Sequence, residues 1–116
     1  MIKGLDNGYL YTKDNELNIF PSAFSVEDKV VSNAISITID NKQYYTGIGK
    51  STVELDKTNL EITKICILTN LAMSNDKEFY LVVGLPVGQY KEQKDKFKEI
   101  ILNYNHCIIE YQNRVM

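Results

Sequence analysis

The chain has 116 residues, of which 44% are hydrophobic, so it can form one domain with a buried core and is too short for two domains of ordinary size. Its 13 basic and 15 acidic residues give a net charge of -2, which argues against a dedicated nucleic-acid surface, because such surfaces carry a basic excess. The sequence has neither an apolar run near the roughly 20 residues that span a bilayer nor the pattern of a signal peptide, so we expect a cytoplasmic protein without membrane contact.

The opening of the chain predicts a three-stranded antiparallel meander. Ile2–Leu5 and Tyr9–Thr12 are short apolar segments joined by Asp6-Asn7-Gly8. An Asn-Gly pair between apolar segments indicates a hairpin, because both residues tolerate the positive φ of a tight turn. A second turn leads to a third strand, Leu17–Phe20, which ends at Pro21.

The middle of the chain predicts a second hairpin and then a helix. Residues 22–33 are polar and mixed and predict no regular structure, whereas isoleucines alternate through residues 34–39 as on one face of a strand. Asp40-Asn41-Lys42 turns the chain back into a strand over residues 43–48. Helical spacing then predicts a helix over residues 59–73. Its apolar face consists of Ile62, Ile65, Cys66, Thr69 and Met73.

The last third predicts a strand, a helix and a final strand. Phe79–Val83 is continuously apolar and is bounded by Gly84 and Pro86, which is typical of a strand that is buried on both faces in the interior of a sheet. We expect it to lie in the same sheet as the opening meander. A helix follows from Pro86 to about Tyr104, and a strand over residues 106–111 comes last. The apolar stripe of this helix is Tyr90, Phe97, Ile100, Ile101 and Tyr104.

The first turn contains the residues best suited to bind an anion. A glycine between two strands, here Gly8, lets backbone N–H groups approach a phosphate closely. An aspartate at the preceding strand end, Asp6, can hold the water shell of Mg²⁺, and Lys13 can return its ammonium to the phosphates. The alternative is an ordinary hairpin turn with an exposed lysine.

Four stretches, in order along the chain, resemble a known family. Asp6–Lys13 resembles the first phosphate loop of actins, with the pattern Asp, any residue, Gly, four residues, Lys. The segments Phe20–Phe24 and Tyr44–Gly47 resemble the start and end of the inserted region in plasmid-partition (ParM-like) actins, and Leu81–Tyr90 resembles their Gly-Leu-Pro strand-to-helix junction. The chain therefore resembles the N-terminal part of a bacterial actin-like ATPase of the ParM-like family.

This resemblance implies a fold and a site. The fold would be α/β, an actin-like (ribonuclease H-like) half-domain over residues 1–116, with a mixed sheet, flanking helices and a small inserted hairpin subdomain at about residues 25–56. Residues Asp6, Asn7, Gly8, Thr12 and Lys13 would bind the phosphates of ATP, and Asp6 would hold Mg²⁺ through water. The two positions after Gly8 differ from actin: this chain has Tyr9 and Leu10, whereas actin has small residues there, including a serine.

The resemblance also implies a function for the intact protein. It would bind ATP and Mg²⁺, form filaments in the bacterial cytoplasm and segregate plasmid or phage DNA through a DNA-bound adaptor, without touching DNA directly. The chain contains no second phosphate loop and no adenosine-binding Gly-Gly stretch, so we expect an inactive fragment. We also expect this fragment to self-associate through its C-terminal strand or the neighbouring helix. The alternatives are a non-enzymatic interaction module with the same half-fold, or another member of the actin, sugar-kinase and heat-shock-chaperone superfamily.

Other candidate residues predict structural roles. Gly47-Ile48-Gly49-Lys50-Ser51 superficially resembles a P-loop but lacks the leading glycine at the required spacing. A lone histidine, His106, fits a structural position, and the lysines of residues 91–98 fit a solvated helix face. Cys66 and Cys107 have neither disulfide-framework nor metal-site spacing, so we expect both to be buried, reduced thiols.

Overall fold

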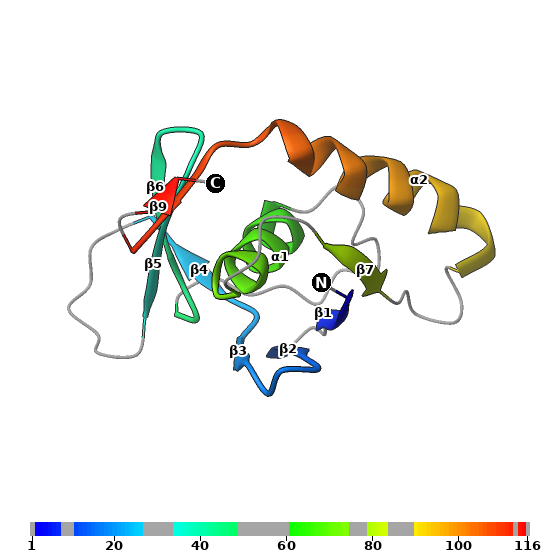
Figure 1. Cartoon of the computed structure of the whole chain (residues 1–116), viewed down its shortest axis with the longest axis horizontal. Helices are drawn as coiled ribbons and strands as arrows, with labels where there is room; N and C mark the ends of the chain where they lie inside the picture. The colour runs from blue at the N-terminus through cyan, green and yellow to red at the C-terminus, as the bar shows by residue number, and fades with distance from the viewer. Residues whose placement is uncertain are drawn as a thin grey trace.

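A computed structural model describes residues 2–7, 11–26, 34–48, 61–74, 79–83, 90–112 and 114–115 of the chain. The two sheets lie on opposite sides of a central helix, and a second helix packs against both this helix and the first sheet (Figure 1). No helix in these ranges is long and apolar enough to cross a membrane. In chain order the elements are β1 (Ile2–Asn7), β2 (Tyr11–Asp14), β3 (Ile19–Pro21), β4 (Phe24–Ser25), β5 (Ile35–Ile39), β6 (Lys42–Thr46), α1 (Glu61–Ala72), β7 (Tyr80–Val83), α2 (Tyr90–Asn103), the 3₁₀ helix η2 (Tyr104–His106), β8 (Ile109–Tyr111) and β9 (Arg114–Val115).

The first sheet has the strand order β3-β2-β1-β7 and confirms the predicted meander. Strands β1, β2 and β3 pair antiparallel, whereas β7 pairs parallel to β1 with Ile2 opposite Tyr80. The sheet is therefore mixed, as the sequence predicts. A parallel partner requires a long crossover, and here the chain between β1 and β7 contains β2 to β6 and α1.

Strand β7 is at the edge of the first sheet, so the prediction of an interior strand buried on both faces was wrong. Tyr80 and Val82 are 77% and 64% exposed, whereas Leu81 and Val83 are half-buried. Both described helices pack on the side of Leu5 and Val83, and among the described residues nothing covers the opposite side of β7. An apolar run predicts a strand, but it does not tell how many of the faces of that strand are covered.

The second sheet has the order β4-β6-β5-β8-β9 and is built around the predicted hairpin. Asp40 and Asn41 form its two-residue loop with φ of 48° and 68°, a conformation that these short polar residues adopt more readily than most. Strand β8 from the end of the chain pairs with β5, so the hairpin is joined to a strand outside the predicted insert at about residues 25–56. Parts of that insert, residues 27–33 and 49–56, lie outside the described residues, and its boundaries stay a prediction.

Helix α1 is buried on almost every side because it lies between the two sheets (Figure 1). Ile65 and Leu68 pack against the second sheet through Ile37 and Ile39, and Ile67 packs against Leu5 of the first sheet. A helix in this position has little solvent-facing surface, which explains why its apolar residues extend beyond the predicted stripe. The helix confirms the predicted element and begins at Glu61.

Several local predictions differ from the structure. Leu17 does not begin a strand: it lies in the β2–β3 turn with φ of 68° and is 91% exposed. The final strand begins at Ile109, because η2 intervenes after α2. Phe24 and Ser25 form a two-residue strand in a segment for which no regular structure was predicted. The starting residue predicted for α2, Pro86, lies outside the described residues.

The cysteines only partly match the prediction. Both Cys66 and Cys107 are free thiols, but Cys66 is buried and Cys107 is half-buried. Burial raises the pKa of the Cys66 thiol to about 11, so this group is held in the unreactive protonated form.

Candidate functional site

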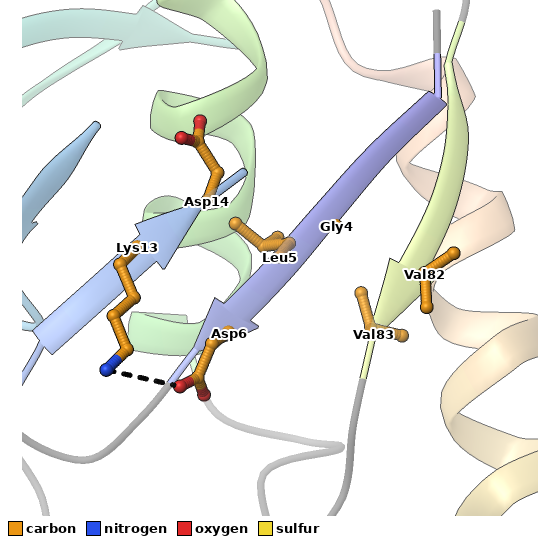
Figure 2. Close-up of a pocket in the computed structure, with 7 residues that line it drawn as sticks. All are labelled: Gly4, Leu5, Asp6, Lys13, Asp14, Val82 and Val83. Carbon is orange, nitrogen blue, oxygen red and sulfur yellow. Dashed lines mark ion pairs between the residues drawn. The ribbon is translucent and has the colours of Figure 1, made fainter. Parts of the chain in front are cut away.

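The first hairpin places Asp6 directly opposite Lys13. The two residues are Cα partners in the β1–β2 register, and alternation along each strand puts both side chains on the outer face of the first sheet. The Lys13 Nζ is 3.8 Å from Asp6 Oδ2, and the side chains are 58% and 67% exposed. Figure 2 shows the two side chains turned toward each other. The pair is therefore an open, solvated ion pair that an incoming ligand can reach.

A hollow of about 480 Å³, open to solvent, lies beside this pair (Figure 2). It lies where β1 and β2 meet the C-terminal part of β7. Its lining consists of Gly4, Leu5, Asp6, Lys13, Asp14, Val82 and Val83. The polar part of this lining thus comes from the hairpin, and the apolar part comes from β7 and β1.

The predicted phosphate-site residue Thr12 does not line the hollow. Thr12 is fully buried on the opposite face of β2, where its Oγ1 is 2.8 Å from Ser22 Oγ. The backbone of Asn7 pairs with that of Thr12 at the end of the hairpin. Gly8 lies outside the described residues. The structure thus brings Asp6 and Lys13 together and directs the Thr12 side chain into the core.

The charges at the hollow fit a phosphate group with a hydrated cation. Lys13 supplies an exposed ammonium, a point charge that can neutralise phosphate oxygens. Asp6 supplies an exposed carboxylate, which can accept hydrogen bonds from the waters that Mg²⁺ retains. In the described part of the chain, His, Cys, Asp and Glu side chains form no group of three that could hold a metal ion directly.

A second ion pair, which the sequence analysis did not predict, lies beneath the hollow. Lys3 is completely buried, and its Nζ is 3.0 Å from Asp14 Oδ2 and 3.5 Å from Glu16 Oε1. The same ammonium donates to the backbone carbonyl of Asn70 at 2.9 Å and to Ser74 Oγ. These contacts join β1, the end of β2 and the C-terminal end of α1.

Asp14 is held ionised by this pair and by its own turn. Burial by itself raises the pKa of this carboxyl, but hydrogen bonds from the Asn18 side chain, Lys3 and the backbone N–H groups of Asn18 and Glu16 together lower the pKa to about 2. The carboxylate is fully covered. One signal in the sequence points to Lys3: it has the same strand parity as Leu5, so it lies on the inner face of β1.

The remaining candidates from the sequence lie elsewhere. His106 is exposed in η2, and Lys96 and Lys98 are exposed on α2, as predicted for a solvated helix face. Of the segment that superficially resembles a P-loop, Gly47 and Ile48 are described and the following residues are not.

Comparisons with known proteins connect this geometry to a family. A model of the N-terminal domain of actin-like proteins matches residues 4–116. A comparison with curated protein sequences gives no significant match.

Several solved structures share the fold. A non-polymerisable quadruple mutant of pCBH ParM has a TM-score of 0.74 and 22% identity over 99% of this chain and 42% of its own. The apo psk41 ParM protein has a TM-score of 0.70 and 15% identity over 98% of this chain and 45% of its own. An AlfA filament bound to AMPPNP has a TM-score of 0.62 and 14% identity over 100% of this chain and 50% of its own. The present chain thus spans half or less of the length of these proteins.

Proposed function

Because this chain belongs to the family of actin-like proteins, whose N-terminal domain matches residues 4–116, we propose that it supplies one wall of the nucleotide site of a filament-forming ATPase. The ligand is the phosphate tail of ATP with its Mg²⁺. The intact protein acts in plasmid or phage DNA segregation in the bacterial cytoplasm. It reaches DNA through a DNA-bound adaptor, in keeping with the net charge of -2.

The observation that carries this proposal is the Asp6–Lys13 pair at the mouth of the hollow. Both groups are exposed and 3.8 Å apart, so a phosphate can replace the carboxylate as the partner of Lys13 without uncovering a buried charge. Asp6 then faces the hydrated cation that accompanies the phosphates. The bound Mg²⁺ would supply charge neutralisation, while this chain orients the phosphate tail.

One wall is insufficient for turnover. Phosphoryl transfer relies on charge stabilisation and positioning from several sides, and this chain spans between 42% and 50% of the matched structures. We therefore expect the chain of 116 residues by itself to bind Mg-ATP weakly or not at all and to hydrolyse none. We expect Mg-ATP binding by the native gene product, which contains this chain and any sequence that accompanies it.

Filament formation has separate support. Two of the structures that share this fold are described as filaments, those of AlfA and Alp12. The first of these is also described as bound to AMPPNP, an ATP analogue. We propose that the intact protein assembles in the same manner and that assembly depends on nucleotide.

Calorimetry with Mg-ATP tests the nucleotide site. The intact protein should bind Mg-ATP, and Lys13→Ala should weaken binding about tenfold or more, because a charge-assisted contact to phosphate is lost. Lys42→Ala is the matched control, since it removes an exposed lysine from β6 in the second sheet and should leave the affinity unchanged. An intact, folded protein that binds no nucleotide would contradict the proposal and would instead support a non-enzymatic interaction module.

A further inference from the structure

We propose that Lys3 is a positioning residue for the phosphate site, whose buried ammonium neutralises Asp14 and so keeps the hollow beside Lys13 receptive to an anion. This inference rests on the proposed function and extends it to a residue that does not touch the ligand. Asp14 itself lines the hollow, while Lys3 lies behind it on the inner face of β1.

The burial of Lys3 requires an explanation in terms of charge. Lysine is rarely fully buried unless it is paired, because an isolated ammonium is costly to remove from water. Here the Nζ lies among Asp14 Oδ2, the carbonyl oxygen of Asn70 and Ser74 Oγ, and it is 5.8 Å from the ring centre of Phe79. The three N–H groups of the ammonium thus each have an oxygen acceptor. Lys3 is therefore buried as one partner of an internal ion pair.

The balance of charge at the hollow depends on this lysine. The residues around the hollow include Asp6, Lys13 and Asp14, and the Asp14 carboxylate is covered and lies against Lys3. With Lys3 next to both Asp14 and Glu16, the groups at and behind the hollow are three carboxylates and two ammonium groups, with a net charge of -1. Without Lys3 the net charge of these groups would become -2, which repels phosphate more strongly.

The same contacts fix the position of Asp14. Its carboxylate accepts the backbone N–H groups of Glu16 and Asn18, both at 2.9 Å, while Lys3 ties it to the end of α1. Asp14 directly follows Lys13, and Figure 2 shows the two side chains pointing in opposite directions from β2. Strand alternation puts Asp14 on the inner side and Lys13 with Asp6 on the outer side, and Lys3 holds the Asp14 carboxylate in place there.

Three variants of the intact protein test this role by Mg-ATP calorimetry. Lys3→Met keeps the length of the side chain without its charge and should weaken binding by about tenfold. Asp14→Asn removes the opposite charge and should tighten binding by a few-fold, roughly the same Coulomb effect with the opposite sign. The double variant Lys3→Met/Asp14→Asn restores the original net charge and should bind within about twofold of the unsubstituted protein.

The opposite effects expected for Lys3→Met and Asp14→Asn distinguish a role in charge balance from a purely structural role. A lysine that only supported the fold would weaken binding when replaced, and Asp14→Asn would weaken it too, without rescue in the double variant. That pattern would overturn the inference, as would unchanged binding by folded Lys3→Met. If Lys3→Met does not fold, Asp14→Asn and the double variant still decide between the two roles. Absence of binding by the unsubstituted protein would overturn the proposed function together with this inference, whereas binding with the wrong pattern would overturn the inference alone.

Discussion

Asp6 and Lys13 face each other across the β1–β2 register, and their charged groups are 3.8 Å apart at the mouth of an open hollow. This relationship requires nothing beyond the hairpin itself. A turn of the observed register brings the sixth and thirteenth residues opposite each other on the same face. The spacing between Asp6 and Lys13 in the sequence therefore reflects the hairpin register as well as the chemistry of a phosphate site.

Loss of either member of this pair should reduce ATP turnover by the intact protein. We expect Asp6→Ala and Lys13→Ala each to lower kcat/KM by about 10²-fold, because each removes a preorganised charge near the phosphates. Phosphate release at saturating and limiting Mg-ATP gives kcat and KM separately. Lys42→Ala again serves as the exposed control. Unchanged turnover in a folded Asp6 or Lys13 variant would remove that residue from the site.

The stability of the chain should depend on pH through Asp14. Its pKa is lowered from 3.8 to about 2 in the folded state, so the folded form is favoured wherever the carboxylate is ionised. This contribution is present above about pH 5 and is lost as the pH falls toward 2, for a total of about 2 kcal/mol. Urea unfolding at pH 6 and at pH 3 should show about half of this decrease in the unfolding free energy, roughly 1 kcal/mol, because pH 3 still lies above the folded-state pKa.

Substitution of Asp14 provides the control for this pH dependence. Asp14→Asn should be less stable than the unsubstituted chain at pH 6 and should lose less stability on acidification, because the titrating group is gone. The exposed α2 residue Asp95 supplies a matched Asp95→Asn variant, in which the decrease should remain. An equal decrease in the Asp14→Asn variant would show that other carboxyls cause the acid sensitivity.

Leu17 is in a conformation that suits other residues better. It has φ of 68° and is 91% exposed, so its side chain contributes little packing while its Cβ crowds the backbone. Leu17→Asn should raise the unfolding free energy by up to about 1 kcal/mol, because asparagine tolerates the left-handed region. The midpoint of urea unfolding measures this change, and a lower midpoint would mean that the leucine makes a contact that its exposure does not reveal.

The isolated chain should self-associate, and the structure changes where we expect the contact. Phe97, a member of the α2 stripe, is only 3% exposed because α1 and β1 cover it. The exposed apolar residues gather instead on the outer face of the first sheet: Ile2, Tyr11, Ile19, Tyr80 and Val82. Covering such a patch favours association at about 25 cal/mol per Å² before the entropic cost.

Light scattering over a concentration series would locate this contact. We expect Tyr80→Lys to weaken association more than Ile108→Lys, which probes the C-terminal strand suggested by the sequence alone. A stronger effect at Ile108 would return the contact to the C-terminal strand. A chain that remains monomeric at hundreds of micromolar would show that neither surface drives association.

The sequence by itself determined the local elements and the spacing of the phosphate loop. The Asp40-Asn41 turn, helix α1 and the meander all follow from short-range patterns, because turn preferences and side-chain periodicity depend on neighbouring residues. The Asp6–Lys13 pair belongs to the same class, since a hairpin register decides it.

The tertiary structure alone decided which faces are covered and which distant charges meet. Alternation assigns Thr12 and Lys13 to opposite faces of β2 but does not tell which face is buried; the helices decide that by packing on the side of Leu5. For the same reason β7 is an exposed edge in spite of its apolar sequence. Lys3 reaches the carbonyl of Asn70 from 67 residues away in the chain. No local pattern records such a contact, because packing of the whole domain is what brings its partners together and excludes the water that would otherwise separate them.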